Sequence, residues 1–177
     1  MILLVVDFQK ALTEDDELYD RDMFLKRTVR LIDVARKNKV EVIFFQHDAG
    51  PGSGFSVGDP DFEIDDRATP EKGEKVFVKT INSCFGNKDF TAYMNSLEDK
   101  RLMIVGLQTN WCIDATVKSA FERGFEVIVP EGTNSTFDND YMNGETTYRY
   151  YNEEIWPDCF ADCVTFDEAM DMIKKEG

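Results

Sequence analysis

The chain has 177 residues, of which 42% are hydrophobic and 31% are charged. These fractions are close to those of ordinary globular proteins, and the length suits one compact domain spanning residues 1–177. Thirty-five acidic against 20 basic residues give a formal net charge of −15. Since no basic face is visible for binding phosphates or anionic lipids, we expect no nucleic-acid partner and no membrane partner.

The N-terminal residues 1–6 form an apolar run of strand length that ends at an acid. The run is shorter than a signal peptide and lacks its basic flank, and no stretch approaches the roughly 18 apolar residues of a membrane span. These features predict a cytoplasmic protein. Neither a CxxC redox motif nor a zinc pattern connects the four cysteines, which we expect to be thiols: Cys84, Cys112, Cys159 and Cys163.

Apolar positions at helical spacing predict an amphipathic helix over residues 22–37. Residues 40–46 are rich in β-branched and aromatic residues and predict a strand, and residues 76–78 predict a shorter one. Between these two strands lies a long loop, roughly residues 47–75, with five glycines and three prolines. Because loops of this length inside a compact domain are usually functional or disordered, this one is a candidate for shaping a binding site.

From residue 89 onward, helices and strands alternate. The pattern predicts helices over 89–97, 111–123 and 140–154 and from 167 to the end, and strands over 101–105, 125–130 and 161–165. Near-continuous apolar strands separated by helices are typical of the α/β class, here a three-layer α/β/α, Rossmann-like arrangement around a mostly parallel six-stranded sheet. Ligands of such sheets bind at the carboxyl ends of the strands.

Three residues whose side chains could take part in catalysis lie at that edge. Asp7 ends the first strand, Lys79 ends the third, and Cys112 follows the fourth at the start of a helix. Taken singly, the cysteine is more often core filler, the aspartate a capping or loop residue, and the lysine a surface residue. Together they indicate acyl transfer through a thioester, because a thiol attacks as its thiolate, which an ammonium and a helix N-terminus both favour. Asp7 would take the thiol proton and pass it to the leaving amine.

Other residues give weaker signals. Cys84 is the main rival nucleophile, but it lacks a strand-to-helix turn whose backbone N–H groups would stabilise an oxyanion. Cys159 and Cys163 are interpreted as structural. Neither a GxGxxG turn nor a GxxxxGK[ST] loop follows any predicted strand, so no cofactor is implied.

Four segments carry a resemblance to a known family. The order VVDFQ, FFQH, VFVKTINSCF and IVGLQTNWCIDATVKSAFERGFEVIV resembles the isochorismatase-like cysteine hydrolases of the nicotinamidase/isochorismatase superfamily over nearly the whole chain. GLQTNWC with the following helix and strand is the most specific piece. The resemblance implies the isochorismatase-like hydrolase fold, homo-oligomers such as dimers or tetramers, and a catalytic triad that maps to Asp7, Lys79 and Cys112. It also implies a cis peptide at Leu107-Gln108 and an oxyanion hole formed by the N–H groups of Gln108 and Cys112.

The resemblance also bears on metals and on the pocket. Nicotinamidases of this family hold a metal through an aspartate and two or three histidines, whereas this chain has one histidine, His47. We therefore predict no catalytic metal, and nicotinamide becomes a less favoured substrate. His47 either lines the substrate pocket or stiffens the long loop as a hydrogen-bonded residue, with the second interpretation slightly favoured. Phe8, Gln9 and Trp111 are candidate pocket walls, with core packing as the alternative.

The leading functional hypothesis is metal-independent hydrolysis of a small amide-type C–N bond, through a thioester on Cys112 with Asp7 as acid and base and Lys79 as electrostatic partner. The alternatives are a nicotinamidase-like amidase, an isochorismatase that hydrolyses a vinyl ether and releases pyruvate, and a catalytically silent binding protein. A cysteine at position 112 favours the first. The acids of the long loop also favour amide hydrolysis weakly, because they would repel isochorismate, which is a dianion.

Overall fold

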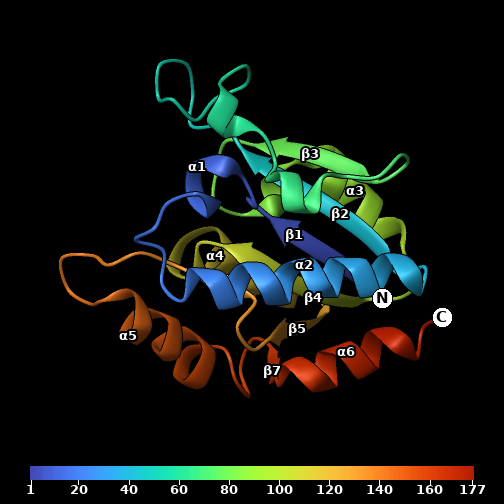
Figure 1. The fold of residues 1–177 in the computed structure, drawn as a ribbon. Coiled ribbons are helices and arrows are strands. Elements are labelled where there is room, and N and C mark those ends of the chain that lie inside the picture. Colours follow the sequence, from blue (N-terminus) through green and yellow to red (C-terminus); the bar gives the residue numbers. More distant parts are fainter.

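A parallel β-sheet forms the centre of the computed structural model, which describes all residues 1–177 (Figure 1). The strand order is β3-β2-β1-β4-β5-β7, and a seventh strand, β6, pairs with β4 off this path. The sequence predicted a mostly parallel sheet, and all pairings between these strands are parallel. The prediction of six strands missed β6, because two residues are too short for a periodic signal. The strands are β1 (Ile2–Val6), β2 (Glu41–His47), β3 (Lys75–Lys79), β4 (Arg101–Leu107), β5 (Glu126–Pro130), β6 (Asn134–Ser135) and β7 (Asp162–Val164).

Six α-helices accompany the sheet: α1 (Lys10–Thr13), α2 (Arg21–Lys37), α3 (Lys88–Ser96), α4 (Asp114–Phe121), α5 (Gly144–Arg149) and α6 (Phe166–Lys174). Two predicted helices differ from the structure. The helix expected over 140–154 begins only at Gly144, because the Asn143 side chain caps it by accepting from the N–H of Thr146, and it continues beyond α5 as a wider π-type turn over 150–155. The helix expected over 111–123 begins with a π-type turn, Thr109–Ile113, and α4 ends at Phe121.

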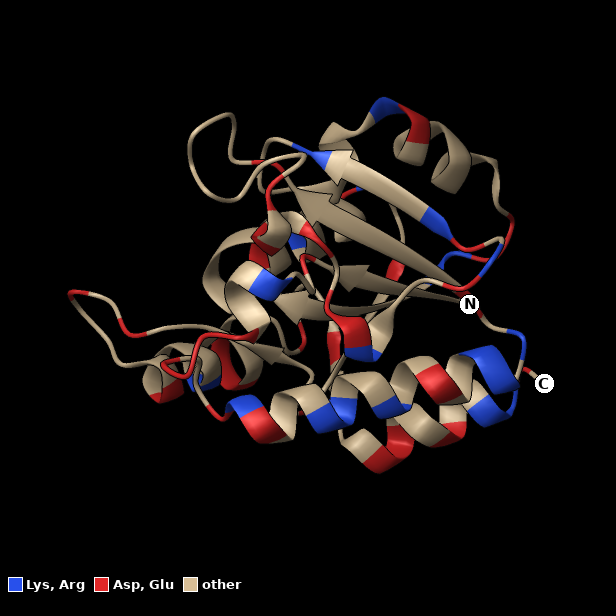
Figure 2. Cartoon of the chain, turned by 45° about the horizontal axis from the view of Figure 1, so that its top comes forward, with Lys and Arg blue, Asp and Glu red and all other residues tan.

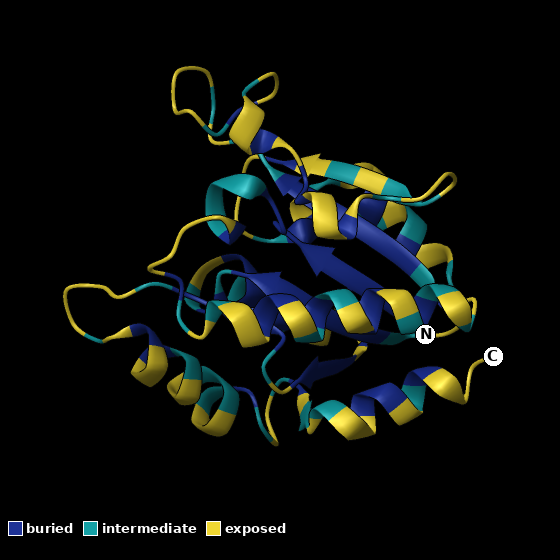
Figure 3. Cartoon of the chain, viewed as in Figure 1, coloured by how far each residue is buried: buried dark blue, intermediate teal, exposed yellow.

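Helices cover both faces of the sheet and produce two cores. The alternation of side chains along β1 sends Leu3 and Val5 into the core beneath α2 and α6, and Leu4 and Val6 into the core beneath α3 and α4. All five β1 residues are buried, and Figure 3 shows β1 dark blue, whereas helix α2 is banded in yellow, teal and blue and edge strand β3 in yellow and teal. Burial of each such aliphatic side chain contributes about 1.5 to 3 kcal/mol.

The long loop between β2 and β3 is irregular apart from two short 3-10 turns, Pro60–Phe62 and Asp66–Ala68. Its second half is fastened to the segment after β1. The N–H of Lys10 donates to the carbonyl of Glu63 at 2.9 Å, and Gln9 Nε2 donates to the carbonyl of Phe62 at 2.7 Å. The loop is therefore tied to the carboxyl end of β1, where ligands bind in such sheets.

Strands β1 and β4 approach each other closely at that end. Gly106 has a φ of +121°, and a Cβ on it would lie 1.9 Å from the carbonyl oxygen of Val6. Only glycine fits this position, since any side chain would collide with the neighbouring backbone. The close approach brings the turn after β4 against the residue that follows β1.

Figure 2 shows basic and acidic residues interspersed along α2, and basic residues are not gathered in one region in this view. None of the helices combines the length and the hydrophobicity that a bilayer crossing requires.

Candidate active site

Lys79 connects the three residues that the sequence singled out. Its ammonium nitrogen Nζ donates to Asp7 Oδ2 at 2.6 Å and to Cys112 Sγ at 3.1 Å. The same Nζ lies 3.2 Å from His47 Nδ1. The four residues come from the carboxyl ends of β1, β2, β3 and β4, which explains how positions more than 100 residues apart in the chain share one site.

Asp7 stands in the turn immediately after β1. Its φ is +50°, in the left-handed region that aspartate tolerates better than most residues, and its N–H donates to the carbonyl of Phe45 at 3.0 Å. The carboxyl group is buried; Oδ2 accepts from Lys79, whereas Oδ1 has no hydrogen-bond partner. An oxygen of this carboxyl lies within 4.8 Å of Cys112 Sγ. Asp7 thus lies near the thiol and has one carboxyl oxygen without a partner.

The turn after β4 places Cys112. The peptide bond Leu107-Gln108 is cis, as the resemblance implied, and the carbonyl of Gln108 accepts from the N–H groups of Trp111 and Ile113 at 3.1 Å each. The N–H of Gln108 has no acceptor within the chain. Cys112 keeps 8% of its surface exposed, so its sulfur is sheltered but open to a small molecule.

Side-chain hydrogen bonds from Asn134 in β6 and from Thr136 just after it hold this turn. Thr109 Oγ1 donates to Asn134 Oδ1 at 2.7 Å, and Thr136 Oγ1 donates to Asn110 Oδ1 at 2.6 Å. At the start of α4, Asp114 Oδ1 accepts from Trp156 Nε1 at 2.9 Å. The short strand missed by the sequence analysis therefore supports the turn before the cysteine, and Trp156 holds the start of α4 after it.

Burial and mutual charge set the protonation states of the site. Burial raises the pKa of Asp7, and the nearby Lys79 ammonium opposes that shift. Burial by itself would lower the pKa of Lys79, but the Asp7 and Cys112 charges outweigh it and the pKa lies above its usual value. Burial, followed by the charge of Asp7, raises the pKa of Cys112 to about 12. The resting site therefore holds an ammonium, a carboxyl group and a protonated thiol.

His47 both lines the pocket and is held by hydrogen bonds, so it has features of both interpretations that the sequence left open. It faces the pocket, and it is also fixed by hydrogen bonds, since its N–H donates to Gln9 Oε1 at 2.7 Å. Its ring lies 6.0 Å from that of Phe55 in the long loop. Burial and the Lys79 charge lower the pKa of His47, so the ring is neutral near pH 7 and its Nδ1 accepts from the ammonium.

A pocket of about 200 Å³ opens above Cys112. Of the four pocket residues expected from the sequence, Trp111 and His47 line it and two do not. Phe8 is fully buried and packs against Phe24 in the core beneath α2, and Gln9 is fully buried under the loop. The lining residues are Asp7, Leu12, His47, Phe55, Asn82, Gln108, Trp111 and Cys112. Sequence analysis missed Leu12, Phe55 and Asn82, whose positions depend on how the loops fold back.

The site does not fit a metal ion. Asp7, His47 and Cys112 are the one group of three potential ligands in the chain with atoms within 4.8 Å of one another. However, the Lys79 ammonium contacts all three of them. A second cation would lie directly against this buried charge, and like charges at such distances repel strongly.

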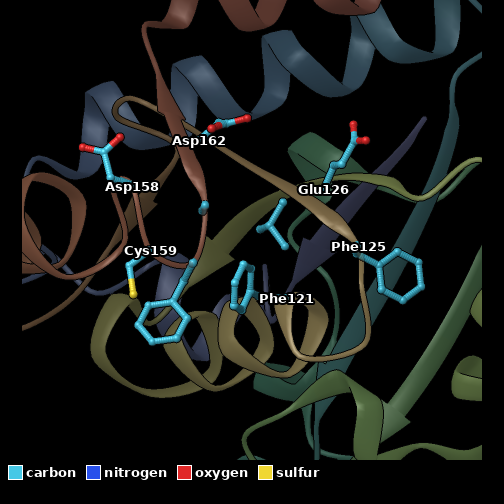
Figure 4. A pocket seen from close by; sticks show the side chains of 9 residues that line it. Phe121, Phe125, Glu126, Asp158, Cys159 and Asp162 are labelled. Atoms are coloured by element: carbon cyan, nitrogen blue, oxygen red, sulfur yellow. The ribbon is translucent and has the colours of Figure 1, made fainter.

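The other cysteines lie outside this arrangement. Cys84 is fully buried and does not line the pocket, and burial raises the pKa of its thiol. Cys163 is half-buried in β7, whereas Cys159 is exposed, so the structural role expected for it has no support in burial. Cys159 borders a separate hollow of about 310 Å³ between the end of α4 and β7 (Figure 4). The ionisable side chains that line this hollow, other than Cys159, are three acids, Glu126, Asp158 and Asp162.

Two relatives illustrate the sequence similarity of the chain. The streptothricin hydrolase of Streptomyces noursei is 29% identical over 137 residues, covering 77% of this chain and 54% of the relative. The chain therefore spans about half the length of the streptothricin hydrolases that it matches. The ureidoacrylate amidohydrolase of Rhizobium rhizogenes is 24% identical over 205 residues, covering 94% of this chain and 83% of the relative.

Solved structures share the fold. A hydrolase of the isochorismatase family from Chromobacterium violaceum has a TM-score of 0.90 at 21% identity, covering 98% of this chain and 93% of that one. N-carbamoylsarcosine amidase from Thermoplasma acidophilum has a TM-score of 0.74 at 19% identity, covering 94% and 96%. The isochorismatase domain family matches residues 1–155. With this match and the parallel sheet, the chain belongs to the isochorismatase family of hydrolases.

Proposed function

We propose that the chain hydrolyses a small amide-type C–N bond without a metal, through a thioester on Cys112. The observation that carries the proposal is the double contact of the Lys79 ammonium, 2.6 Å from Asp7 Oδ2 and 3.1 Å from Cys112 Sγ, beneath a pocket open to small molecules. A buried ammonium beside sulfur stabilises the thiolate in the act of attack, when its negative charge develops.

Asp7 is the base and then the acid. The unpartnered Oδ1 takes the thiol proton while the sulfur attacks the carbonyl carbon, and burial makes Asp7 a stronger base than an exposed aspartate. The carbonyl oxygen becomes an oxyanion that accepts from the N–H groups of Gln108 and Cys112. The Gln108 N–H supports this role because it has no acceptor within the chain.

Collapse of the tetrahedral intermediate breaks the C–N bond, and protonated Asp7 gives its proton to the leaving nitrogen. The acyl group stays on Cys112 as a thioester. Water then attacks the thioester carbonyl while Asp7 takes one water proton, and that proton passes to the sulfur as the acid product leaves. Lys79 keeps its charge throughout, since its pKa lies above the usual range.

The relatives support hydrolysis of an amide-type bond over hydrolysis of a vinyl ether. Two of those described above carry the names amidohydrolase and amidase. Vinyl-ether hydrolysis proceeds by protonation and gives no role to a thiol held against an ammonium.

The test is a screen of small amides, ureas and isochorismate for release of ammonia or pyruvate. Cys112→Ala is expected to lower kcat/KM for the hydrolysed amide at least about 1000-fold, because it removes the nucleophile. Cys84→Ala is the matched control and is expected to keep most of the activity. Pyruvate release from isochorismate by Cys112→Ala at the wild-type rate, or amide hydrolysis that survives the substitution, would contradict the proposal.

A further inference from the structure

The pocket above Cys112 contains no unpaired positive charge. None of the 20 lysine and arginine residues lines it. Lys79 lies beneath the floor with 1% of its side chain exposed, and its ammonium contacts the Asp7 carboxylate, the Cys112 sulfur and His47. A bound molecule therefore meets no free ammonium or guanidinium group.

Neither His47 nor Lys10 supplies a free positive charge to the pocket. His47 faces the pocket as a neutral ring, because burial and Lys79 lower its pKa. Lys10 is the nearest basic residue in sequence to the pocket residue Leu12, and its Nζ is paired with Asp66 at 2.8 Å. No other ionisable side chain on the wall is basic.

Negative charge lies next to the pocket instead. Asp48 follows His47 directly, and its Oδ1 accepts from Ser56 Oγ at 2.6 Å and from the N–H of Gly50 at 2.9 Å. These hydrogen bonds lower the pKa of Asp48, so it is a carboxylate near pH 7. With a formal charge of −15 on the whole chain, the surrounding field repels anions as they approach.

The walls suit a flat, uncharged molecule. The rings of His47, Phe55 and Trp111 line the pocket and offer faces for stacking, and Trp111 is 56% exposed at the mouth. The side-chain amides of Asn82 and Gln108 can each donate and accept a hydrogen bond. These groups recognise neutral polar atoms, but a carboxylate entering the pocket would lose water without gaining a cation, which is unfavourable.

Resting on the function proposed above, we propose that the substrate is a small uncharged amide or ureide with a flat unsaturated group, and that amides carrying a carboxylate are rejected. The ureidoacrylate amidohydrolases among the relatives are named for a substrate with a carboxylate. The chain thus differs from these relatives in the charge of the substrate it accepts.

Two alkylating reagents of matched size test the charge selection without relying on turnover. The intact protein is treated with iodoacetamide or with iodoacetate, and alkylation rates at each cysteine are followed by peptide mass mapping. The ratio of the iodoacetamide rate to the iodoacetate rate is expected to be on the order of tenfold higher at Cys112 than at Cys159. A carboxylate must lose its water to reach buried Cys112 in a pocket without a cation, whereas Cys159 is exposed to solvent. Cys159 is a strict control because it lies among acids.

The difference is expected to persist at high salt, where the long-range field of the acidic surface is screened. Leu12→Lys adds a cation to the wall and is expected to speed iodoacetate labelling of Cys112 several-fold, whereas Leu12→Gln, the uncharged control, is not. Equal reagent ratios at Cys112 and Cys159 in the wild-type protein would overturn the charge selection, even if Leu12→Lys fails to fold.

A pair of amides that differ by one carboxylate provides a second test of the charge selection. Benzamide is expected to be hydrolysed, or to protect Cys112 from iodoacetamide, at least about tenfold more effectively than 4-carbamoylbenzoate. Equal effects of the two would overturn the inference and leave the proposed function standing. If no amide is hydrolysed and neither reagent labels Cys112, the proposed function itself fails.

Discussion

Cys112 and Cys84 are the two buried cysteines, and their surroundings show what makes one of them a nucleophile. Burial raises the pKa of both thiols, so low acidity of the resting thiol does not separate them. Cys112 lies on the pocket floor, 3.1 Å from the Lys79 ammonium and within 4.8 Å of an oxygen of the Asp7 carboxyl group. Cys84 is sealed in the core beneath α3 and α4. Access from the pocket and the direct contact with Lys79, rather than burial, distinguish the two thiols.

The two cysteine turns are held by similar hydrogen bonds. Thr116 Oγ1 accepts from the N–H of Cys84 at 3.2 Å, and Thr109 Oγ1 donates to Asn134 in the turn that bears Cys112. Both threonines are fully buried. The comparison is therefore between two turns of similar packing, one of which faces a pocket and an ion pair and one of which faces only the core.

The largest expected effect concerns the ion pair. Lys79→Met leaves the Asp7 carboxylate buried without its partner and is expected to lower the free energy of unfolding by about 3 to 5 kcal/mol. Cys84→Ala only shortens a core side chain and is expected to cost about 1 kcal/mol. Urea denaturation measures both.

Addition of Asp7→Asn to Lys79→Met removes the uncompensated charge and is expected to restore part of the lost stability. If Lys79→Met and Cys84→Ala cost the same, or the double variant is the least stable of the series, the charge-based distinction between the two regions is wrong.

The second effect is on the pH dependence of kcat/KM. Asp7 must be ionised to take the thiol proton, so activity falls as the pH drops through the pKa of Asp7, which burial raises above the usual range. Lys79→Met removes the charge that opposes this shift, and the acidic limb of the profile is expected to move up by about 1 to 3 pH units. Cys84→Ala is expected to leave the limb in place. A limb that moves downward in Lys79→Met would rule out Asp7 as the base.

The smallest effects come from the two threonines. Thr109→Val and Thr116→Val each remove one buried hydrogen bond and are expected to lower the free energy of unfolding by about 1 kcal/mol. Only Thr109→Val is expected to lower kcat as well, because its turn positions Cys112 and the Gln108 N–H. Steady-state kinetics and urea denaturation of both variants check this prediction. A loss of kcat in Thr116→Val alone would contradict it.

Much of the architecture was predictable from the sequence. Apolar runs such as residues 1–6 and the helical periodicity of residues 22–37 reflect burial on both faces and on one face, respectively, and the structure has β1 and α2 there. Asp7, Lys79 and Cys112 were found because residues at the carboxyl ends of parallel strands meet at one edge. The cis peptide came from the resemblance alone.

The walls of the pocket were less predictable. Phe8 follows Asp7 directly, but the left-handed turn at Asp7 sends the next side chain under α2, and adjacency in sequence does not reveal this direction. Phe55 reaches the pocket from an irregular loop, and Asn82 from the segment after β3. Such contacts depend on tertiary packing between segments without a periodic pattern.

Trapping the acyl-enzyme tests the central claim most directly. Once the screen has identified a hydrolysed amide, the wild-type protein is quenched in acid during turnover, and its intact mass and peptides are compared with those of Cys112→Ala and Cys84→Ala. The account predicts an added acyl mass on the peptide that bears Cys112, present in the wild type and in Cys84→Ala and absent from Cys112→Ala. An acyl group on Cys84 with Cys112 unmodified would contradict it.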